Sequence, residues 1–122
     1  MKLTRMDIDP RSYSNCVSVT EFNRLLFVTA QVPLDDDGKV PEGFDAQCRL
    51  AWRNLLAVLE SAGMGAENLV KISVFLADRG DREANARIRH EVLGEHAPAQ
   101  CIVVAGIYDE EWLVAIDAVA AG

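Results

Sequence analysis

The last quarter of the chain, His96–Gly122, reads HAPAQCIVVAGIYDEEWLVAIDAVAAG. Two apolar stretches, Ala99–Ala105 and Leu113–Val119, flank a glycine and an acidic cluster, a pattern that predicts a β-hairpin with a long loop. Neither stretch alternates cleanly between polar and apolar residues, so we expect both faces of these strands to be buried. Gln100 and Asp117 are the exceptions, and a buried polar side chain needs a partner or a purpose.

The residues before this stretch predict three more strands and two helices. We expect an irregular or edge lead-in over residues 1–11 and a first hairpin formed by Tyr13–Thr20 and Leu25–Val32. A helix over residues 43–63, a strand over 70–76 and a second helix over 81–93 follow from the spacing of apolar residues. The order β-β-α-β-α-β-β predicts one α+β domain, residues 1–122, with two helices packed on one face of a mixed sheet.

The second helix has an apolar side and a charged side. Ala84, Ile88 and Val92 recur at four-residue steps and are expected to face inward. The charged residues of this helix are interpreted as a solvated outer face: Arg82, Glu83, Arg87, Arg89 and Glu91.

Composition narrows the possible partners. A net charge of -7 disfavours nucleic acid, which requires a basic surface, and no apolar run is long enough to cross a membrane. The first ten residues lack the apolar core of a signal peptide, so we expect a cytoplasmic protein. Cys16, Cys48 and Cys101 lack metal-ligand spacing and are interpreted as free, buried thiols. Asp35–Gly38 is interpreted as a solvated turn, because consecutive carboxylates do not converge on one ion, so no metal site is expected.

The strands carry apolar residues on both faces, whereas two helices can cover only one. Ile102 and Val104 alternate with Cys101, Val103 and Ala105. Because a second apolar face would be a large exposed patch, we expect it to be buried against other copies of the same chain.

Three stretches together resemble the Rid family, whose members are also called YjgF or L-PSP proteins. Phe27–Pro33, FVTAQVP, is similar to the family's F-x-S-G-Q-I-P, and Asn54–Asp78 is similar to its N-L-x-x-V-L-x-x-A-G helix and the V-K-x-T-V-F-L-x-D strand after it. The end of the chain resembles P-A-R-S-x-V followed by E-I-E-A-x-A. The resemblance implies a chorismate mutase-like fold, a homotrimer around a central barrel, a small-molecule cleft at each subunit interface and no cofactor.

The resemblance also implies deamination of imines and enamines, but two positions depart from it. The family arginine that clamps the substrate carboxylate corresponds to Gln100, which offers hydrogen bonds without charge. The family glutamate that activates water corresponds to Ala115, which transfers no proton. A divergent hydrolase acting on a substrate without a free carboxylate is therefore the first hypothesis, and 2-iminopropionate is not the expected substrate.

The resemblance also supplies candidate site residues. Gln100, Asp117 and Tyr13 are the candidates for catalysis. The candidates for ligand binding are Tyr13, Thr29, Ala30, Asn85, Gln100, Cys101 and Trp112. Structural roles stay open: Gln100 could satisfy main-chain groups at a subunit contact, Asp117 could be an internal acceptor and Trp112 could pack at the hairpin tip. Cys101 could be a nucleophile with His96 as base, although a thiol in an apolar strand is usually inert packing.

Two alternatives to an enzyme acting on imines remain. A non-catalytic trimer that binds or senses a metabolite is favoured by the joint absence of the arginine and the glutamate. A ribonuclease is disfavoured by the acidic composition.

Overall fold

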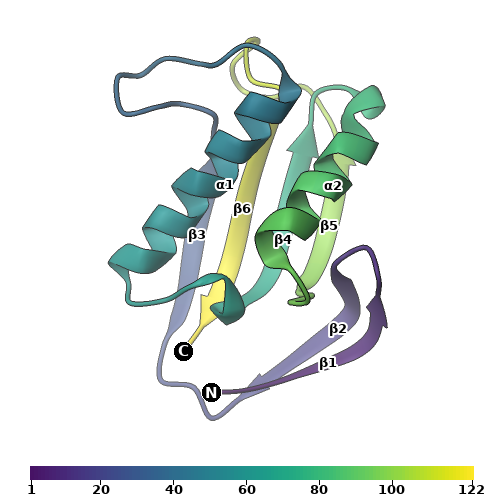
Figure 1. The fold of residues 1–122 in the computed structure, drawn as a ribbon. Helices are drawn as coiled ribbons and strands as arrows, with labels where there is room; N and C mark the ends of the chain where they lie inside the picture. The colour runs from purple at the N-terminus through teal and green to yellow at the C-terminus, as the bar shows by residue number, and fades with distance from the viewer.

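Four strands form a mixed sheet in the order β3-β6-β4-β5 in the computed structural model, which describes residues 1–122. These strands are β3 (Leu25–Gln31), β4 (Leu69–Leu76), β5 (Ala99–Val104) and β6 (Val114–Ala121). The helices α1 (Phe44–Ser61) and α2 (Arg82–Leu93) cover one face of this sheet (Figure 1), and β1 (Lys2–Asp9) and β2 (Tyr13–Thr20) form a separate two-stranded sheet. Two short 3-10 turns, η1 (Ala66–Asn68) and η2 (Arg79–Asp81), precede β4 and α2. The expected α+β class is confirmed.

The expected C-terminal hairpin is wrong, because β4 lies between β5 and β6. β5 runs parallel to β4, with Gln100 opposite Ile72 and Val104 opposite Leu76. β6 runs antiparallel to both β4 and β3. The side chains of β6 that point toward the helices are completely or almost completely buried, and only a central position in the sheet buries them so fully: Val114, Ile116, Ala118 and Ala120.

The expected first hairpin is also wrong, because β2 pairs with β1 and not with β3. The lead-in that we expected to be irregular forms strand β1, whose register places Leu3 opposite Val19. β3 instead pairs with β6, and the main-chain N–H groups of Asn23 and Arg24 both donate to the carbonyl oxygen of Gly122 at 2.9 Å. The C-terminal strand β6 is therefore the partner of β3 in place of β2.

The β1–β2 hairpin attaches to the beginning of β5. The N–H of Ser14 donates to the carbonyl oxygen of Pro98 at 3.1 Å, and the Ser14 hydroxyl donates to the carbonyl oxygen of Ala97. The turn of this hairpin includes Ser12, whose φ of 70° lies in the left-handed region. The hairpin therefore lies across one end of the sheet beside α2 (Figure 1).

The core lies between the helices and the sheet. Trp52, Leu55 and Leu59 of α1 and Ile88 of α2 are buried against Ile72, Val74, Leu76 and the inward side chains of β6. The inward side of α2 is confirmed, but the interpretation of Arg89 as part of a solvated outer face is wrong. The Arg89 residue is only 2% exposed, because the turn of the β1–β2 hairpin packs over it.

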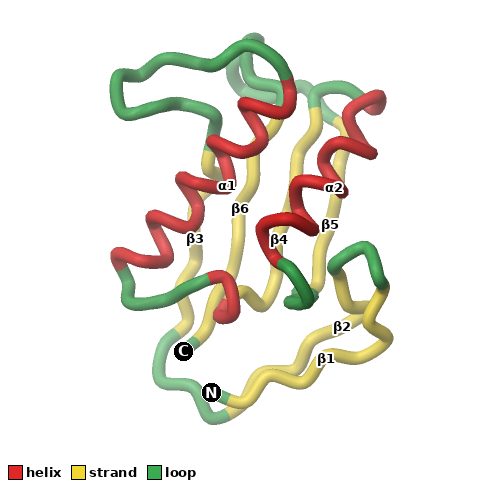
Figure 2. The backbone as a smooth tube through the Cα atoms, in the orientation of Figure 1, coloured by secondary structure: helices red, strands yellow, loops and turns green.

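Two loops meet at the opposite end of the sheet, where the connections from β3 to α1 and from β5 to β6 lie (Figure 2). Gln47 of α1 joins them: its Nε2 donates to the carbonyl oxygens of Pro41 at 3.1 Å and Glu111 at 3.0 Å, and its Oε1 accepts from the N–H of Leu113 at 2.7 Å. A buried amide with these three bonds fixes where β6 begins.

The sheet face that carries no helix, here called the open face, is largely exposed. Strand pairing places Phe27, Lys71, Phe75, Cys101, Val103, Asp117 and Val119 on it. Phe27 is 74% exposed and Val103 39%. The expectation that β5 is buried on both faces is therefore wrong for the single chain. No helix is long and apolar enough to span a membrane.

Candidate functional site

A cleft of about 700 Å³ lies between α2, β5 and the β1–β2 hairpin. Such a volume suits a small organic molecule. Its walls are formed by Arg11, Tyr13, Leu76, Arg79, Arg82, Glu83, Ala86, Arg89, Gln100, Ile102 and Val104.

Regular secondary structure explains why these side chains converge. Gln100, Ile102 and Val104 occupy alternate positions of β5 and therefore point to the same side of the sheet as the helices. Arg82, Ala86 and Arg89 follow one another at steps of four and three residues along α2, so they share one side of the helix. The hairpin closes the cleft at the Arg89 end with Arg11 and Tyr13.

Arg89 is the buried cation of the cleft. Its Nη2 donates to the carbonyl oxygen of Arg11 at 2.8 Å, whereas its Nε and Nη1 have no hydrogen-bond partner. Burial, and then the nearby charge of Arg11, lower the pKa of the Arg89 guanidinium. Since a buried donor without a partner is costly, these N–H groups are suited to receive an acceptor from outside the chain.

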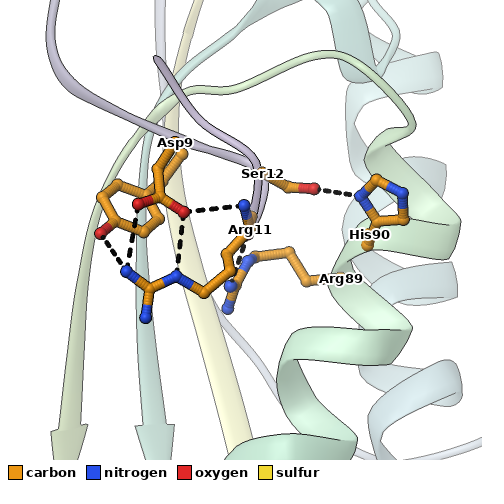
Figure 3. Close-up of polar contacts among 6 residues, drawn as sticks. Asp9, Arg11, Ser12, Arg89 and His90 are labelled. Carbon is orange, nitrogen blue, oxygen red and sulfur yellow. Dashed lines mark hydrogen bonds and ion pairs between the residues drawn. The ribbon is translucent and has the colours of Figure 1, made fainter. Parts of the chain in front are cut away.

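Arg11 extends from the hairpin turn next to Arg89 (Figure 3). Its Nε and Nη2 donate to the two carboxylate oxygens of Asp9 at 2.9 and 3.0 Å, and Nη2 also contacts the Tyr13 hydroxyl at 3.1 Å. Hydrogen bonds from Arg11 hold the pKa of Asp9 well below its usual range. Arg11 is therefore already paired, which leaves Arg89 as the unpaired cation at this end.

The hairpin turn is held against α2 by a second contact. The Ser12 hydroxyl lies 2.7 Å from Nδ1 of His90, the residue after Arg89 (Figure 3). Together with the bond from Arg89 to the carbonyl oxygen of Arg11, this contact fixes the hairpin over the cleft.

Gln100 faces the same cleft with an unused acceptor. Its Oε1 is buried and has no hydrogen-bond partner. The amide therefore satisfies no main-chain group within the chain, and the structural alternative, in which it satisfies main-chain groups at a subunit contact, stays open. Gln100 and Tyr13 are the two sequence-based candidates that the cleft brings together.

The other candidate residues lie elsewhere in the single chain. Asn85 is 1% exposed and faces the core, with its Oδ1 4.0 Å from the Cys48 thiol. Thr29 and Ala30 are exposed on β3, at the opposite edge of the sheet from β5.

The remaining candidates flank or face away from the cleft. Cys101 and Asp117 are both opposite Ser73 on the open face, and Cys101 is exposed, as is Cys16. The expectation of free thiols is confirmed, but only Cys48 is buried. Trp112 is half-buried in the β5–β6 connection, where its Nε1 has no partner.

The two positions that depart from the family pattern point to opposite faces of the sheet. Gln100 is opposite Ile72 on the helix side, whereas Ala115 is opposite Phe75 on the open face. In one chain, the residue at position 100 therefore faces the helix side of the sheet and the residue at position 115 faces the open face.

The sequence analysis missed Arg11, Arg79, Arg82 and Arg89 as cleft residues. The i, i+4, i+7 spacing of Arg82, Ala86 and Arg89 was available as a signal, but only the packing shows that this side of α2 faces β5 and the hairpin. Arg89 lines the same cleft as Gln100 and places a cation there.

Comparisons with known proteins agree with this fold. The family model described as endoribonuclease L-PSP matches residues 7–122. A RutC family protein of Pyrococcus horikoshii is 30% identical over 110 residues, which cover 88% of this chain and 85% of the relative. A RutC family protein of Synechocystis is 37% identical over 102 residues, which cover 80% and 78%.

Solved structures are similar along the whole chain. The crystal structure of YyfB from Yersinia pestis, described as a Rid family protein of unknown function, matches with a TM-score of 0.87, 22% identity and complete coverage of both chains. Escherichia coli TdcF with bound serine matches with a TM-score of 0.77 and 20% identity over 98% of this chain and 99% of that one. Two helices packed on mixed strands, with these neighbours, fit the chorismate mutase-like α+β fold.

Proposed function

Because the chain belongs to the Rid (YjgF or L-PSP) family, we propose that it hydrolyses a small imine, enamine or related metabolite in the cleft between α2 and β5. The observation that carries the proposal is the pair of buried, unpartnered polar groups in one cleft, Oε1 of Gln100 and the Nε and Nη1 groups of Arg89. A bound molecule with both an N–H and an anionic oxygen satisfies all of them.

The proposed reaction adds water to the C=N bond and releases an amine or ammonia, leaving a carbonyl product. Both protons of the water end on the leaving nitrogen, so the site needs groups that transfer protons. On the cleft wall, the Tyr13 hydroxyl and the Glu83 carboxylate are able to do so. Asp117 remains a candidate if the open face of a neighbouring subunit contributes to the site.

A homotrimer forms part of the proposal. The exposed apolar side chains of the open face support burial against further copies of the chain. In such a trimer the interface candidates Thr29, Ala30 and Cys101 come from surfaces that the single chain leaves exposed. The cytoplasm remains our expectation for its location.

The archetypal substrate 2-iminopropionate is not expected to be hydrolysed at the family's rate. Gln100 provides no charge and Ala115 no general base, a contribution usually worth about 10²–10⁴-fold. The test compares the natural protein with Gln100→Arg, Ala115→Glu and the double variant, by release of ammonia from 2-iminopropionate. We expect negligible activity in the natural protein and a gain in the double variant beyond either single change. Family-level activity in the natural protein would contradict this part of the proposal.

The proposed reaction itself is tested with a series of imines generated from different amino acids. We expect faster hydrolysis of at least one, and a loss of about tenfold or more in Tyr13→Phe and Gln100→Leu. Tyr108→Phe is the matched control, because Tyr108 is 98% exposed and does not line the cleft. If no imine is hydrolysed faster than in buffer, the alternative of a non-catalytic binding or regulatory trimer replaces the enzyme.

A further inference from the structure

The cleft has a cationic group at each end. Arg82 and Arg89 are separated by seven residues on α2, which corresponds to about 10 Å along the helix axis and almost two complete turns. The two side chains therefore leave the helix on the same side but at opposite ends of the cleft. Arg79, in the turn before α2, adds a further cation at the Arg82 end.

The residues of β5 that line the cleft also differ between its two ends. β5 runs antiparallel to α2, since β4 and β5 are parallel and α2 connects them. Gln100, at the beginning of β5, therefore lies at the Arg89 end, and Val104 at the Arg82 end. Between them, Ile102 of β5 and Ala86 of α2 form an apolar middle section.

Three of the four arginines of this cleft form no ion pair, although the chain has 19 acidic and 12 basic residues, and the fourth, Arg11, is paired with Asp9. Arg79 and Arg82 form no ion pair, whereas Arg49, Arg53 and Arg87 on other surfaces each contact a carboxylate. Glu83 is the only carboxylate among the residues of the cleft wall. Because Arg11 is paired with Asp9, three arginines without an ion pair, Arg79, Arg82 and Arg89, face one carboxylate, and they favour an anion of more than one charge.

We propose that the cleft binds a small elongated molecule with an anionic group at each end and an apolar middle, such as a linear dicarboxylate. The inference rests on the proposed function, in which this same cleft holds the substrate. One anionic group is bound by Arg89 with Gln100 beside it, and the other by Arg82 and Arg79. A compact dianion such as phosphate fits less well, because the two cationic ends are separated by apolar residues.

Binding of non-reactive probes tests this inference independently of catalysis. Calorimetry at low and moderate salt compares adipate, hexanoate, adipamide and inorganic phosphate. We expect adipate to bind about tenfold or more tightly than hexanoate and phosphate, and adipamide to bind least. Equal affinity for adipate and hexanoate would indicate a single anion subsite. A preference for phosphate would indicate a compact anion site. Either result overturns the proposal.

Variants assign the two ends. Arg82→Gln should reduce adipate affinity to that of hexanoate while leaving hexanoate affinity almost unchanged, because Arg82 is exposed and has no partner whose loss would disturb the fold. Arg89→Gln should weaken both probes. Arg53→Gln is the matched control, since Arg53 is exposed, contacts only Asp36 at 3.8 Å and does not line the cleft.

The same variants separate this inference from two alternatives. If the arginines pair with carboxylates of a second copy, Arg82→Gln and Arg79→Gln will reduce the molar mass in light scattering without changing adipate affinity, which overturns the proposal. If dicarboxylates bind as expected but no imine is hydrolysed, the binding inference stands and the enzymatic proposal fails. If imines are hydrolysed but adipate does not bind, the enzymatic proposal stands and the binding inference fails.

Discussion

Arg89 and Arg11 lie 78 positions apart in the chain, and Nη2 of Arg89 donates to the main-chain carbonyl oxygen of Arg11 at 2.8 Å. This bond places the guanidinium under the hairpin turn, where two of its N–H-bearing nitrogens have no partner (Figure 3). A charge buried in this way costs stability, so its presence is better explained by a ligand than by folding.

The first prediction contrasts a functional buried polar group with a structural one. Arg89→Met should change the free energy of unfolding of the ligand-free protein by less than about 1 kcal/mol, because removal of an incompletely paired buried charge offsets the loss of the bond to the Arg11 carbonyl oxygen. Gln47→Met should lower it by about 2–4 kcal/mol, because three hydrogen bonds that join two loops are lost. Urea denaturation measures both. A loss for Arg89→Met as large as that for Gln47→Met would assign Arg89 a structural role.

The second prediction concerns the assembly. Light scattering at micromolar concentration should give about three times the chain mass of 13.4 kDa, because burial of the open face against further copies removes its apolar side chains from water. Phe27→Asp should shift the protein toward monomer, since a carboxylate would enter that interface. Tyr108→Asp is the control, because Tyr108 is exposed but does not lie on the open face. A stable monomer of the natural protein would refute the argument.

The third prediction uses the three thiols as reporters of that interface. Cys16 and Cys101 are exposed in the single chain and Cys48 is buried. In the native assembly Cys16 should react quickly with a thiol reagent, whereas Cys101, on the open face, should react slowly because other subunits cover it. Mass spectrometry after brief labelling identifies the modified residues. Rapid labelling of Cys101 in a protein that is trimeric by light scattering would place the interface on another surface.

A fourth prediction follows from the burial of Cys48. Burial raises the pKa of this thiol to about 12. The unfolded chain loses the proton near the ordinary pKa of about 8.5, so above that pH the native state holds more protons and stability falls as pH rises toward 12. Cys48→Ala should remove this part of the pH dependence of the free energy of unfolding, whereas Cys16→Ala should preserve it. An unchanged profile in Cys48→Ala would mean that other groups produce the decline.

Residue patterns in the sequence predicted most of the local structure. Tyr13–Thr20 is a strand with the expected bounds, and the ends of both helices lie within two residues of the expected ones. Apolar periodicity of two or about 3.6 residues is a local property, so it identifies an element and the side that it buries without reference to the rest of the chain. The three motifs then identified the family, which the comparisons confirm.

Only the tertiary structure decided which strands pair and which charged residues are buried. Periodicity does not identify a strand's neighbour, and so both expected hairpins were wrong: β6 inserts between β3 and β4, and β2 pairs with β1. Arg89 has the local sequence environment of a solvated helix residue. Its burial arises when the hairpin turn docks on α2 through the Arg11 carbonyl oxygen and the contact between Ser12 and His90. The spacing of Arg82 and Arg89 places them on one side of α2, but these partners are distant in the chain, so only the packing shows that Arg89 is buried.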